Sequence, residues 1–364
     1  MINKKIIIAT GGTGGHIFPA YSLANYFTKS NYNVILTLDN RGFKYLADYK
    51  NLKLVKIPSS PLKKKNIFNL LFSIIKIIFS IFKSLAFLIL NRPKIIFGMG
   101  GYSSFPICIA AKILKIDFII YENNLIIGKA NKYLLPFAKK IFVSYKELEG
   151  IPSKYSDKVY QIGNIVREEM LNMKLDNFEE EIMNKINILV LGGSQGAKVF
   201  GERLPQIFEK LKKSKIPIKI FQQCPIDQND YLTKFYKDAQ IDCKIFNFSS
   251  QIVDYYLKAN LVITRSGASV LGELININKP FISIPLPSSA DDHQLKNAEY
   301  YENKGFGFLI NEKDINYKLF DLIKSIYLDN STIKKILASQ RQYSDKNTFK
   351  NIKTYLEKII NEKN

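Results

Sequence analysis

Residues 6–16 read IIIATGGTGGH, and residues 188–197 read ILVLGGSQGA. In each segment a run of apolar residues, typical of a buried strand, ends in a glycine pair. Strand-like apolar runs alternate with longer helical patterns through most of the 364 residues, which favours parallel sheets built from βαβ units. The predicted architecture is therefore α/β, with two doubly wound domains that each open with a strand and a glycine turn.

The expected domain limits follow from this repeated opening. The chain is long for one domain and suits two. We expect residues 1–163 to form the first domain, residues 164–340 the second, and a last helix within residues 341–364 to pack back on the first. Ligands of such sheets bind beyond the carboxyl ends of the strands, so two facing domains are expected to enclose a cleft.

Composition narrows the classes of function. The chain carries 53 Lys and Arg against 32 Asp and Glu, a net charge of +21. Either the sequence is simply rich in lysine throughout, or the charge serves a polyanionic partner. It contains no zinc-finger spacing, basic heptad region or RNA-binding aromatic run, so we expect no nucleic-acid partner. Cys108, Cys224 and Cys243 fit no metal or redox spacing and indicate a reducing compartment.

The loop Gly11–Gly15 offers a tight turn with accessible backbone N–H groups at the start of a helix. Such a turn suits a phosphate, because the amides and the helix dipole both attract an anion. The alternative is a turn that only lets the helix pack on the sheet. His16 follows at the helix start, where a side chain with a pKa near neutrality could take a proton from a hydroxyl. A histidine with a purely structural hydrogen bond is the other interpretation.

A dinucleotide-binding site is a second interpretation of the same loop. Gly12 and Gly14 match the first two glycines of that fingerprint, and Asp39 ends the next strand, where an acid would bind a ribose. Ile17, however, occupies the position of the third glycine. An NAD-dependent oxidoreductase is therefore kept as an alternative function.

The second half contains a similar arrangement. Arg265–Ser269 follows a strand and opens a helix whose small residues again suit a diphosphate. Glu273 lies almost two turns further along, where its carboxylate could bind both hydroxyls of a ribose, unless it is a solvated surface glutamate. Asp291 and Asp292 precede another helix and are expected to cap it. Nothing in the sequence requires a metal.

The segment Asn66–Leu90 is the most unusual part of the chain, because 18 of its 25 residues are apolar. Its polar positions recur every three or four residues and form a narrow stripe on a helix. A membrane span would bury Lys76 and Lys83 at about 2.5–3.5 kcal/mol each, and would split the first sheet. With the lysines at 63–65, the segment predicts a surface that dips into an anionic bilayer. A helix buried by its neighbours and by the other domain is the alternative.

Seven short motifs, taken in order, resemble glycosyltransferase family 28, and within it the N-acetylglucosaminyltransferases of peptidoglycan synthesis. They extend from Ile6 to about residue 310. The motifs are Gly11–His16, Gly98–Tyr102, Glu122–Asn124, Gly163–Arg167, Gly192–Ala197, Arg265–Ala268, and His293-Gln294 with Asn297-Ala298. Each motif is short, but seven of them in this order at matching intervals are highly specific.

The resemblance implies the GT-B fold, two facing Rossmann-like domains with the active site in the cleft between them. It implies inverting transfer of N-acetylglucosamine from UDP-GlcNAc to the C4 hydroxyl of undecaprenyl-diphosphate-linked MurNAc-pentapeptide (lipid I to lipid II), without a metal or a cofactor. It also implies a peripheral position on the cytoplasmic face of the plasma membrane, with other proteins of wall synthesis and division as partners. A membrane-docked nucleotide-sugar binder without catalysis is the remaining alternative.

The resemblance further assigns roles to single residues. His16 would be the general base, with Glu122 as the alternative. The residues expected to contact the donor are Arg167, Ser194, Ala268, Ser269, Glu273 and Gln294, with a backbone contact to uracil near Ser249. The residues expected to face the sugar and the acceptor are Thr13, Gly14, Gly15 and Asn124.

Three positions depart from the family pattern. Tyr121 and Asn123 flank Glu122 where histidine and glutamine are more usual, so no direct role is carried over to them. Ser249 stands where isoleucine is common, so only its backbone is carried over. The helix start Ala268–Glu273 keeps its ends but not its middle.

Overall fold

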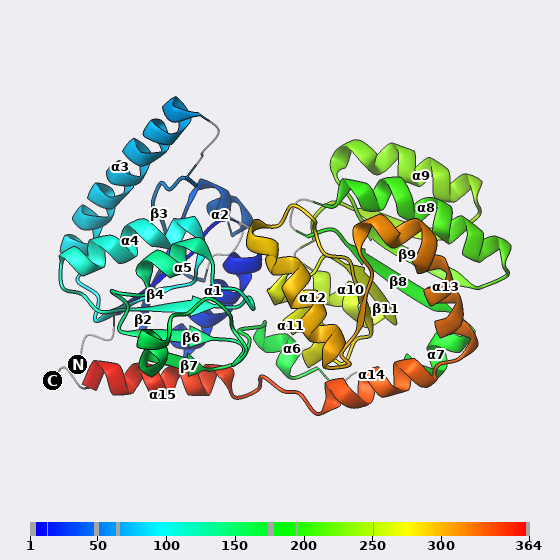
Figure 1. Cartoon of the computed structure of the whole chain (residues 1–364). Helices are drawn as coiled ribbons and strands as arrows, with labels where there is room; N and C mark the ends of the chain where they lie inside the picture. Colours follow the sequence, from blue (N-terminus) through cyan, green and yellow to red (C-terminus); the bar gives the residue numbers. More distant parts are fainter. Residues whose placement is uncertain are drawn as a thin grey trace. The chain divides into compact units, whose positions relative to one another are not determined.

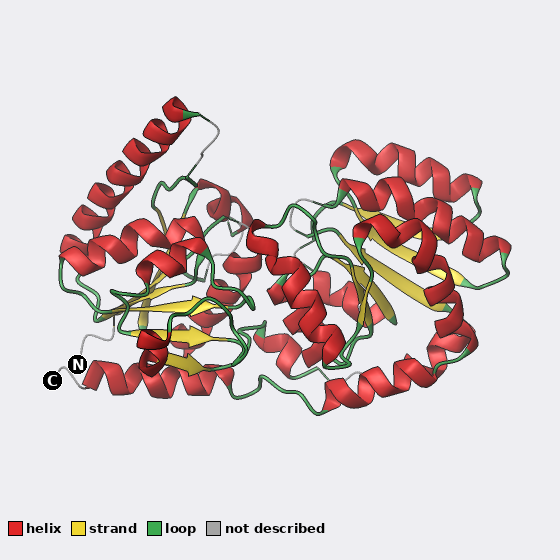
Figure 2. Cartoon of the chain, viewed as in Figure 1, coloured by secondary structure: helices red, strands yellow, loops and turns green. Residues whose placement is uncertain are grey.

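The computed structural model describes residues 5–12, 14–46, 51–62, 66–173, 178–193, 196–249 and 251–361. The chain forms two compact units, each built around its own parallel sheet (Figures 1 and 2). Unit 1 comprises Met1–Arg167 and Asp345–Asn364, and unit 2 comprises Glu168–Ser344. Two parallel sheets with alternating helices confirm the predicted class of two Rossmann-like domains.

The described strands of unit 1 form one sheet in the order β3-β2-β1-β4-β5-β6-β7. Its elements are β1 (Lys5–Ala9), α1 (Gly14–Lys29), β2 (Asn33–Leu38), α2 (Asn40–Tyr45), β3 (Lys53–Lys56), α3 (Ile67–Asn91), β4 (Ile95–Gly98), α4 (Gly101–Ile113), β5 (Phe118–Glu122), α5 (Lys129–Leu134), β6 (Lys140–Val143), η1 (Ser153–Lys158), β7 (Val159–Gln161) and α15 (Thr348–Asn361). The order reverses between β1 and β4, and ligands of such sheets bind where it reverses. Both glycine motifs of the first half follow these two strands.

The central strands of unit 1 are apolar on both faces, as expected for a parallel sheet covered by helices. Ile7 and Ala9 of β1 join a buried cluster with Ile107 of α4. On the other face, the ring of Phe142 in β6 lies 5.8 Å from that of Tyr355 in α15. Helix α4 therefore packs on one face of the sheet, and α15 packs on the other.

A hydrogen-bonded joint connects the last part of unit 1 to the segment after β7. The Asp345 carboxylate accepts hydrogen bonds from the backbone N and the Nδ2 of Asn164, at 2.9 and 3.1 Å. Thr348 Oγ1 donates to Ile162 O at 2.9 Å. Gly163 has φ 93°, and a Cβ there would lie 2.4 Å from Asp345 Oδ1, so only glycine fits.

The described strands of unit 2 form a sheet in the order β10-β9-β8-β11-β12-β13, again parallel. The elements are α6 (Glu168–Leu171), α7 (Phe178–Asn184), β8 (Ile186–Leu191), α8 (Lys198–Lys213), β9 (Ile218–Gln223), η2 (Ile226–Gln228), α9 (Asn229–Asp238), β10 (Asp242–Phe246), α10 (Ile252–Lys258), β11 (Leu261–Thr264), α11 (Ala268–Asn276), β12 (Phe281–Ser283), η3 (Ala290–Asp292), α12 (His293–Asn303), β13 (Phe308–Leu309), η4 (Glu312–Asp314), α13 (Ile315–Leu328) and α14 (Ser331–Arg341). Here the order reverses between β8 and β11, whose following loops carry the motifs of the second half.

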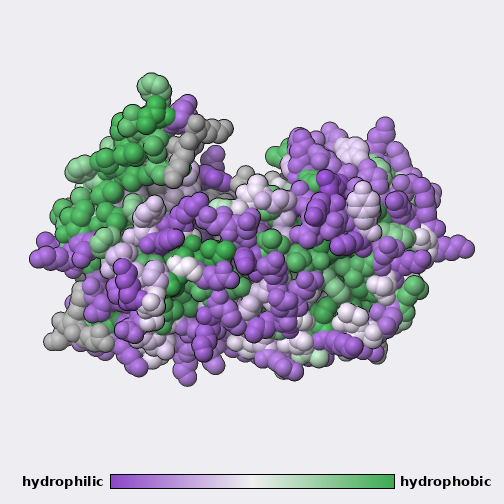
Figure 3. Space-filling model, in the orientation of Figure 1, coloured by the Kyte–Doolittle hydropathy of each residue, from purple (hydrophilic) through white to green (hydrophobic). Residues whose placement is uncertain are grey.

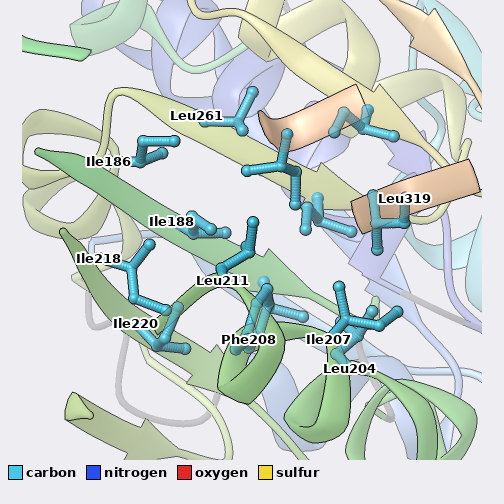
Figure 4. Close-up of a cluster of buried hydrophobic side chains, with 14 of the residues drawn as sticks. Ile186, Ile188, Leu204, Ile207, Phe208, Leu211, Ile218, Ile220, Leu261 and Leu319 are labelled. Atoms are coloured by element: carbon cyan, nitrogen blue, oxygen red, sulfur yellow. The ribbon is translucent and has the colours of Figure 1, made fainter. Parts of the chain in front are cut away.

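Figure 4 shows the hydrophobic core of unit 2. Ile186 and Ile188 of β8 pack with Leu204, Phe208 and Leu211 of α8, and all five are fully buried. The α8 residues are spaced by three or four, so they lie on one face of the helix. This packing anchors β8 and β11, the two strands that carry the candidate donor-binding loops.

Helix α3 presents its apolar side to solvent. Among its exposed side chains, Phe68 is 79% exposed, Ile75 63% and Phe82 65%. The space-filling view shows this side as a continuous hydrophobic surface (Figure 3). Of the described helices, only α3 is long and apolar enough to cross a membrane. The exposure contradicts the part of the alternative in which neighbouring elements of unit 1 bury α3.

The serines of α3 face the protein instead. Ser73, Ser80 and Ser84 are buried, and each hydroxyl donates to a carbonyl one turn earlier at 2.7–2.8 Å. A satisfied serine is small and lets another helix approach closely, so this side suits packing within the protein. Lys76 and Lys83 lie over the rings of Phe72 and Phe79 at 4.2 and 4.8 Å. The polar stripe therefore splits into an inner serine row and outer lysines.

Candidate functional site

The two glycine motifs of unit 1 meet at His16, in the first turn of α1. A Cβ added at Gly100 would lie 3.4 Å from His16 Cε1, and one added at Gly101 would lie 3.4 Å from Cδ2. The imidazole therefore packs directly on the backbone of the second motif. Thr10 Oγ1 also donates to His16 O at 3.0 Å. The side chain is half-buried, which leaves part of the ring accessible at the edge where β1 and β4 end.

Asp39 lies behind the first glycine motif and is 3% exposed. Its Oδ1 accepts hydrogen bonds from Gly12 N at 3.1 Å and from Gly42 N at 2.7 Å, the second of which caps α2. The Gly12 N–H is therefore bonded within the protein and is not one of the accessible N–H groups predicted for this loop. Because the acid serves the loop, it is not placed as a ribose-binding acid, and the NAD alternative loses its main support.

The carboxylate of Glu122, at the end of β5, is buried and accepts four hydrogen bonds. Oε1 accepts from the backbone N and the Nδ2 of Asn124, at 3.1 and 2.9 Å. Oε2 accepts from Gly128 N and Asn131 Nδ2, both at 2.9 Å. A carboxylate has about four lone-pair positions, so these bonds occupy it. The Glu122 carboxylate therefore holds the loop Asn124–Gly128 in place.

His16 and Asn131, which bonds the other candidate base Glu122, both lie next to Gly100. Gly100 is flanked by His16 Cε1 and by Asn131 Nδ2, each 3.4 Å from a Cβ added there. Asn131 in turn bonds Glu122. The structure thus brings the catalytic candidates of unit 1 to one edge of the sheet.

The other predicted residues of unit 1 lie on the same elements. Gly14 is buried and Gly15 exposed in the first turn of α1. Asn124 is half-buried and held by Glu122. The guanidinium of Arg167 lies 4.8 Å from the ring centre of Phe18, also in α1. Thr13 lies outside the described residues.

Unit 2 has a candidate anion site where helix α11 begins. The hydroxyl of Ser266 is fully buried, and within the described part of the chain it has no hydrogen-bond partner. Ala268 and Ser269 form the first turn of α11, at the positive end of the helix dipole. An unbonded buried hydroxyl beside a helix N-terminus suits a phosphate oxygen.

Arg265, which immediately precedes Ser266, holds this loop in place through its side chain. Its Nη1 donates to Ile284 O and Pro285 O, both at 3.2 Å, and its Nη2 pairs with Glu312. The guanidinium also lies over the ring of Phe200, 4.8 Å from its centre. The arginine therefore anchors the loop to neighbouring elements.

Glu273 lies on the second turn of α11 and is 7% exposed, which excludes a solvated surface glutamate. Tyr256 OH donates to its Oε2 at 3.2 Å. A carboxylate with one oxygen steadied by a tyrosine is well suited to accept hydrogen bonds from a diol.

The segment before α12 has an unusual backbone. Asp291 and Asp292 both have φ 52°, a left-handed conformation that costs a non-glycine residue about 1–3 kcal/mol. The prediction that their side chains cap α12 is wrong, because Asp292 is the N-cap residue but makes no capping bond. Ser289 Oγ accepts from Gln294 N instead, at 3.4 Å, and Gln294 Oε1 accepts from Leu286 N at 3.0 Å.

Two further predicted residues complete unit 2. Ser249 lies in the loop between β10 and α10, where its Oγ accepts from Gln251 N at 3.1 Å. Ser194 lies outside the described residues. Among the residues that the structure describes, no three His, Cys, Asp or Glu side chains gather as a metal site would need.

Sequence comparison covers both units. The glycosyltransferase family 28 N-terminal domain matches residues 6–143, and the family's C-terminal domain matches residues 187–356. A curated relative from Pelagibacter ubique is 36% identical over 99% of this chain and 100% of its own length. Another, from Rickettsia canadensis, is 35% identical over 88% of this chain and 91% of its own. The chain belongs to glycosyltransferase family 28.

Solved structures share the fold of this family 28 chain. The crystal structure of Acinetobacter baumannii MurG has a TM-score of 0.75 and 23% identity, and the alignment covers 97% of this chain and 99% of that one. Staphylococcus aureus MnaA with UDP has a TM-score of 0.67 and 16% identity, with 98% and 97% covered. At these identities the likeness supports the two-domain GT-B architecture.

The structure adds to the family 28 motifs one candidate site residue that the sequence had not singled out, Asn131, which holds Glu122 from α5. Within the predicted anion loop, Ser266 is the residue whose buried hydroxyl lies beside α11. Tyr121, the departure from the family pattern, is 2% exposed, and its OH bonds Ser144 Oγ at 2.8 Å and accepts from Ile165 N at 3.1 Å. Burial raises the pKa of Tyr121 well above its ordinary value. Its role is to hold the segment after β7 on the sheet.

Proposed function

We propose that this chain transfers N-acetylglucosamine from UDP-GlcNAc to the C4 hydroxyl of undecaprenyl-diphosphate-linked MurNAc-pentapeptide, which converts lipid I into lipid II. The observation that carries the proposal is similarity over nearly the whole chain. Relatives from three genera are named UDP-N-acetylglucosamine--N-acetylmuramyl-(pentapeptide) pyrophosphoryl-undecaprenol N-acetylglucosamine transferase. The geometry of both units is consistent with that reaction, as follows.

Unit 2 would hold the donor. The first turn of α11, with Ala268, Ser269 and the Ser266 hydroxyl, would receive the diphosphate, and Glu273 would bind the ribose diol. Gln294 would contact the sugar, and the backbone near Ser249 the uracil. Negative charge accumulates on the departing UDP, so the positive end of the α11 dipole stabilises the transition state more than the ground state. Arg167 and Ser194 complete the proposed donor contacts.

Unit 1 would hold the acceptor, through Thr13, Gly14, Gly15 and Asn124. His16 would take the proton of the C4 hydroxyl as that oxygen attacks the anomeric carbon. The new C–O bond forms as the bond from the anomeric carbon to the β-phosphate oxygen of UDP breaks, with inversion. His16 is preferred to Glu122 as base because the Glu122 carboxylate already accepts four hydrogen bonds.

The exposed side of α3 supports a peripheral position on an anionic membrane. Apolar side chains such as Phe68 and Phe82 would enter the lipid surface, and Lys76 and Lys83 would lie near its head groups. The lysines at 63–65, outside the described residues, would add to this attraction. The serine side of α3 is buried in unit 1 and the helix connects two strands of one sheet, so α3 is not free to span the bilayer. The proposed acceptor lipid would bring the enzyme to the cytoplasmic face of the membrane, where other proteins of wall synthesis would be its partners.

One assay tests this function. UDP release from UDP-GlcNAc is measured with and without a lipid I analogue. The proposal expects release that depends on the analogue and forms a disaccharide product. Binding of UDP-GlcNAc without turnover would leave a nucleotide-sugar binder, and binding of NAD without UDP would overturn the family-based function.

A further inference from the structure

We infer that Asp39 and Tyr102 form a clamp that joins the two glycine motifs of unit 1 and thereby fixes the position of His16. The clamp is defined as these two side chains and their hydrogen bonds. The inference rests on the proposed function only in giving His16 the role of base. Asp39 and Tyr102 are then positioning residues.

One buried carboxylate connects three elements. Tyr102 OH, at the start of α4, donates to Asp39 Oδ2 at 2.8 Å. The other oxygen, Oδ1, accepts from Gly12 N in the first motif and from Gly42 N in α2. Hydrogen bonds to an ionised, buried acceptor are roughly twice as strong as neutral ones. The loops after β1, β2 and β4 are therefore tied to a single side chain.

The space around the clamp is closely filled. A Cβ added at Gly11 would lie 2.5 Å from Ser103 Oγ and 2.8 Å from Asp39 Oδ1. One added at Gly12 would lie 3.6 Å from Tyr102 Cε1. The two glycine motifs are thus in direct contact, and the bond from Tyr102 to Asp39 fixes their separation.

The orientation of the His16 ring depends on the separation of the two motifs, because the residue contacts both. It continues the first motif, and its ring packs on Gly100 and Gly101 of the second. If the motifs move apart, the ring loses the surface that orients it. A displacement of about 1 Å at a reacting group can cost about 100-fold in rate. Burial, reinforced by the bond to Asp39, raises the pKa of Tyr102 to about 12, so the tyrosine remains a donor across the pH range of any assay.

The test uses the small number of histidines. The chain has two, and His293 lies in unit 2, so NMR spectra of histidine-labelled protein contain one signal set for His16 and one internal control. Tyr102→Phe removes only the donor hydroxyl, and Asp39→Asn removes the charge. We expect both to shift the ring signals of His16 and leave those of His293 in place. The kcat should fall about 10-fold for Tyr102→Phe and up to about 100-fold for Asp39→Asn, with donor KM within about twofold of wild type.

Tyr32→Phe is the matched control. Tyr32 OH donates to Glu357 Oε1 at 3.0 Å. This is the same type of bond in the same unit, but it connects the segment after α1 to α15. This variant should lower the unfolding temperature without changing the His16 signals or kcat. If Tyr102→Phe behaves like Tyr32→Phe, the clamp is wrong. If the wild type transfers no sugar, the proposed function fails, yet the His16 signals still decide whether the clamp exists.

Discussion

At the scale of single residues, the two candidate bases differ in what surrounds their proton-accepting atoms. His16 is half-buried and rests on a backbone surface, whereas the oxygens of Glu122 already accept four hydrogen bonds. A base must be able to bind one more proton in the transition state. The four bonds to Glu122 support the loop that follows it, and they are the reason we propose His16 as the base.

Replacing His16 with alanine should lower kcat by about 10²–10⁴-fold, the usual range for loss of a general base. Donor KM should change little, because the proposed donor contacts lie mainly in unit 2. Steady-state kinetics with a lipid I analogue measure both constants. A change confined to acceptor KM would instead give His16 a role in binding the acceptor diphosphate.

Glu122→Gln is the companion experiment. The amide keeps one acceptor oxygen but turns an NH₂ group toward two donors, so the loop Asn124–Gly128 should loosen. We expect a lower unfolding temperature and a moderate loss of kcat. A loss as large as that of His16→Ala in a fully folded variant would reverse the assignment.

Glu273→Ala should raise the KM for UDP-GlcNAc, since a ribose contact contributes to binding in the ground and transition states alike. Tyr256→Phe is the matched variant, because it removes the bond to Glu273 Oε2 and leaves the carboxylate. Its effect on KM should have the same direction and be smaller. Unchanged KM in Glu273→Ala would remove this residue from the donor site.

At the scale of an element, α3 separates membrane binding from folding. Phe72 and Phe79 are 57% and 53% exposed, so changing both to glutamate should cost little stability. Burying a phenylalanine contributes about 1.5–3 kcal/mol, and we expect partitioning to anionic vesicles to weaken by at least about 10-fold. Vesicle sedimentation measures this, and turnover of a long-chain acceptor should fall while a short-chain, water-soluble acceptor is still used.

The opposite face of α3 supplies the control. Ser80→Leu places a large side chain at a position that is 1% exposed, so overpacking should destabilise the protein by about 1–3 kcal/mol. Vesicle binding by the folded fraction should persist. Equal loss of vesicle binding in both variants would argue that the exposed face has no special role.

Some features of the fold and of the candidate site could be predicted from the sequence, and others could not. Helix α3, the glycine turns and most strands follow from local patterns, since each depends on residues close together in the chain. The side to which the α3 polar stripe faces could not be predicted from a local pattern. A polar stripe usually faces water, but here the serines face the protein because their hydroxyls are hydrogen-bonded within the helix. The bond of Asp39 to Tyr102 joins residues 63 positions apart, and no local pattern reports it.

At the scale of the whole molecule, buried Lys279 makes the stability of unit 2 depend on pH. Its Nζ donates to Ala259 O, the C-cap of α10, and its own carbonyl accepts from Gln340 in α14. Burial lowers the pKa of Lys279 from 10.5 to about 7. Between pH 7 and 10.5 the lysine is therefore mostly protonated in the unfolded chain and mostly neutral in the folded unit. Because the unfolded state binds more protons, the contribution of Lys279 raises the free energy of unfolding as pH rises.

The expected size of this effect is on the order of 4 kcal/mol between pH 7 and pH 10. Denaturant unfolding at several pH values measures it, and Lys279→Met is the reference that lacks the titrating group. The difference between wild type and variant should grow in favour of wild type with rising pH. A difference that is constant with pH would mean that the ammonium stays charged in the folded unit.

The division of the chain also has a consequence for its synthesis. Unit 1 is completed only by Asp345–Asn364, which emerges after all of unit 2. A ribosome that adds about 5–20 residues per second needs roughly 10–40 s for the intervening segment. During that interval Tyr26 and Tyr160 lack the rings of Phe349 and Tyr355 that later pack on them at 5.0 and 4.8 Å. Until α15 is synthesised, the aromatic side chains of unit 1 that later pack on it stay uncovered in the nascent chain. Exposed apolar surface of this kind is what chaperones bind.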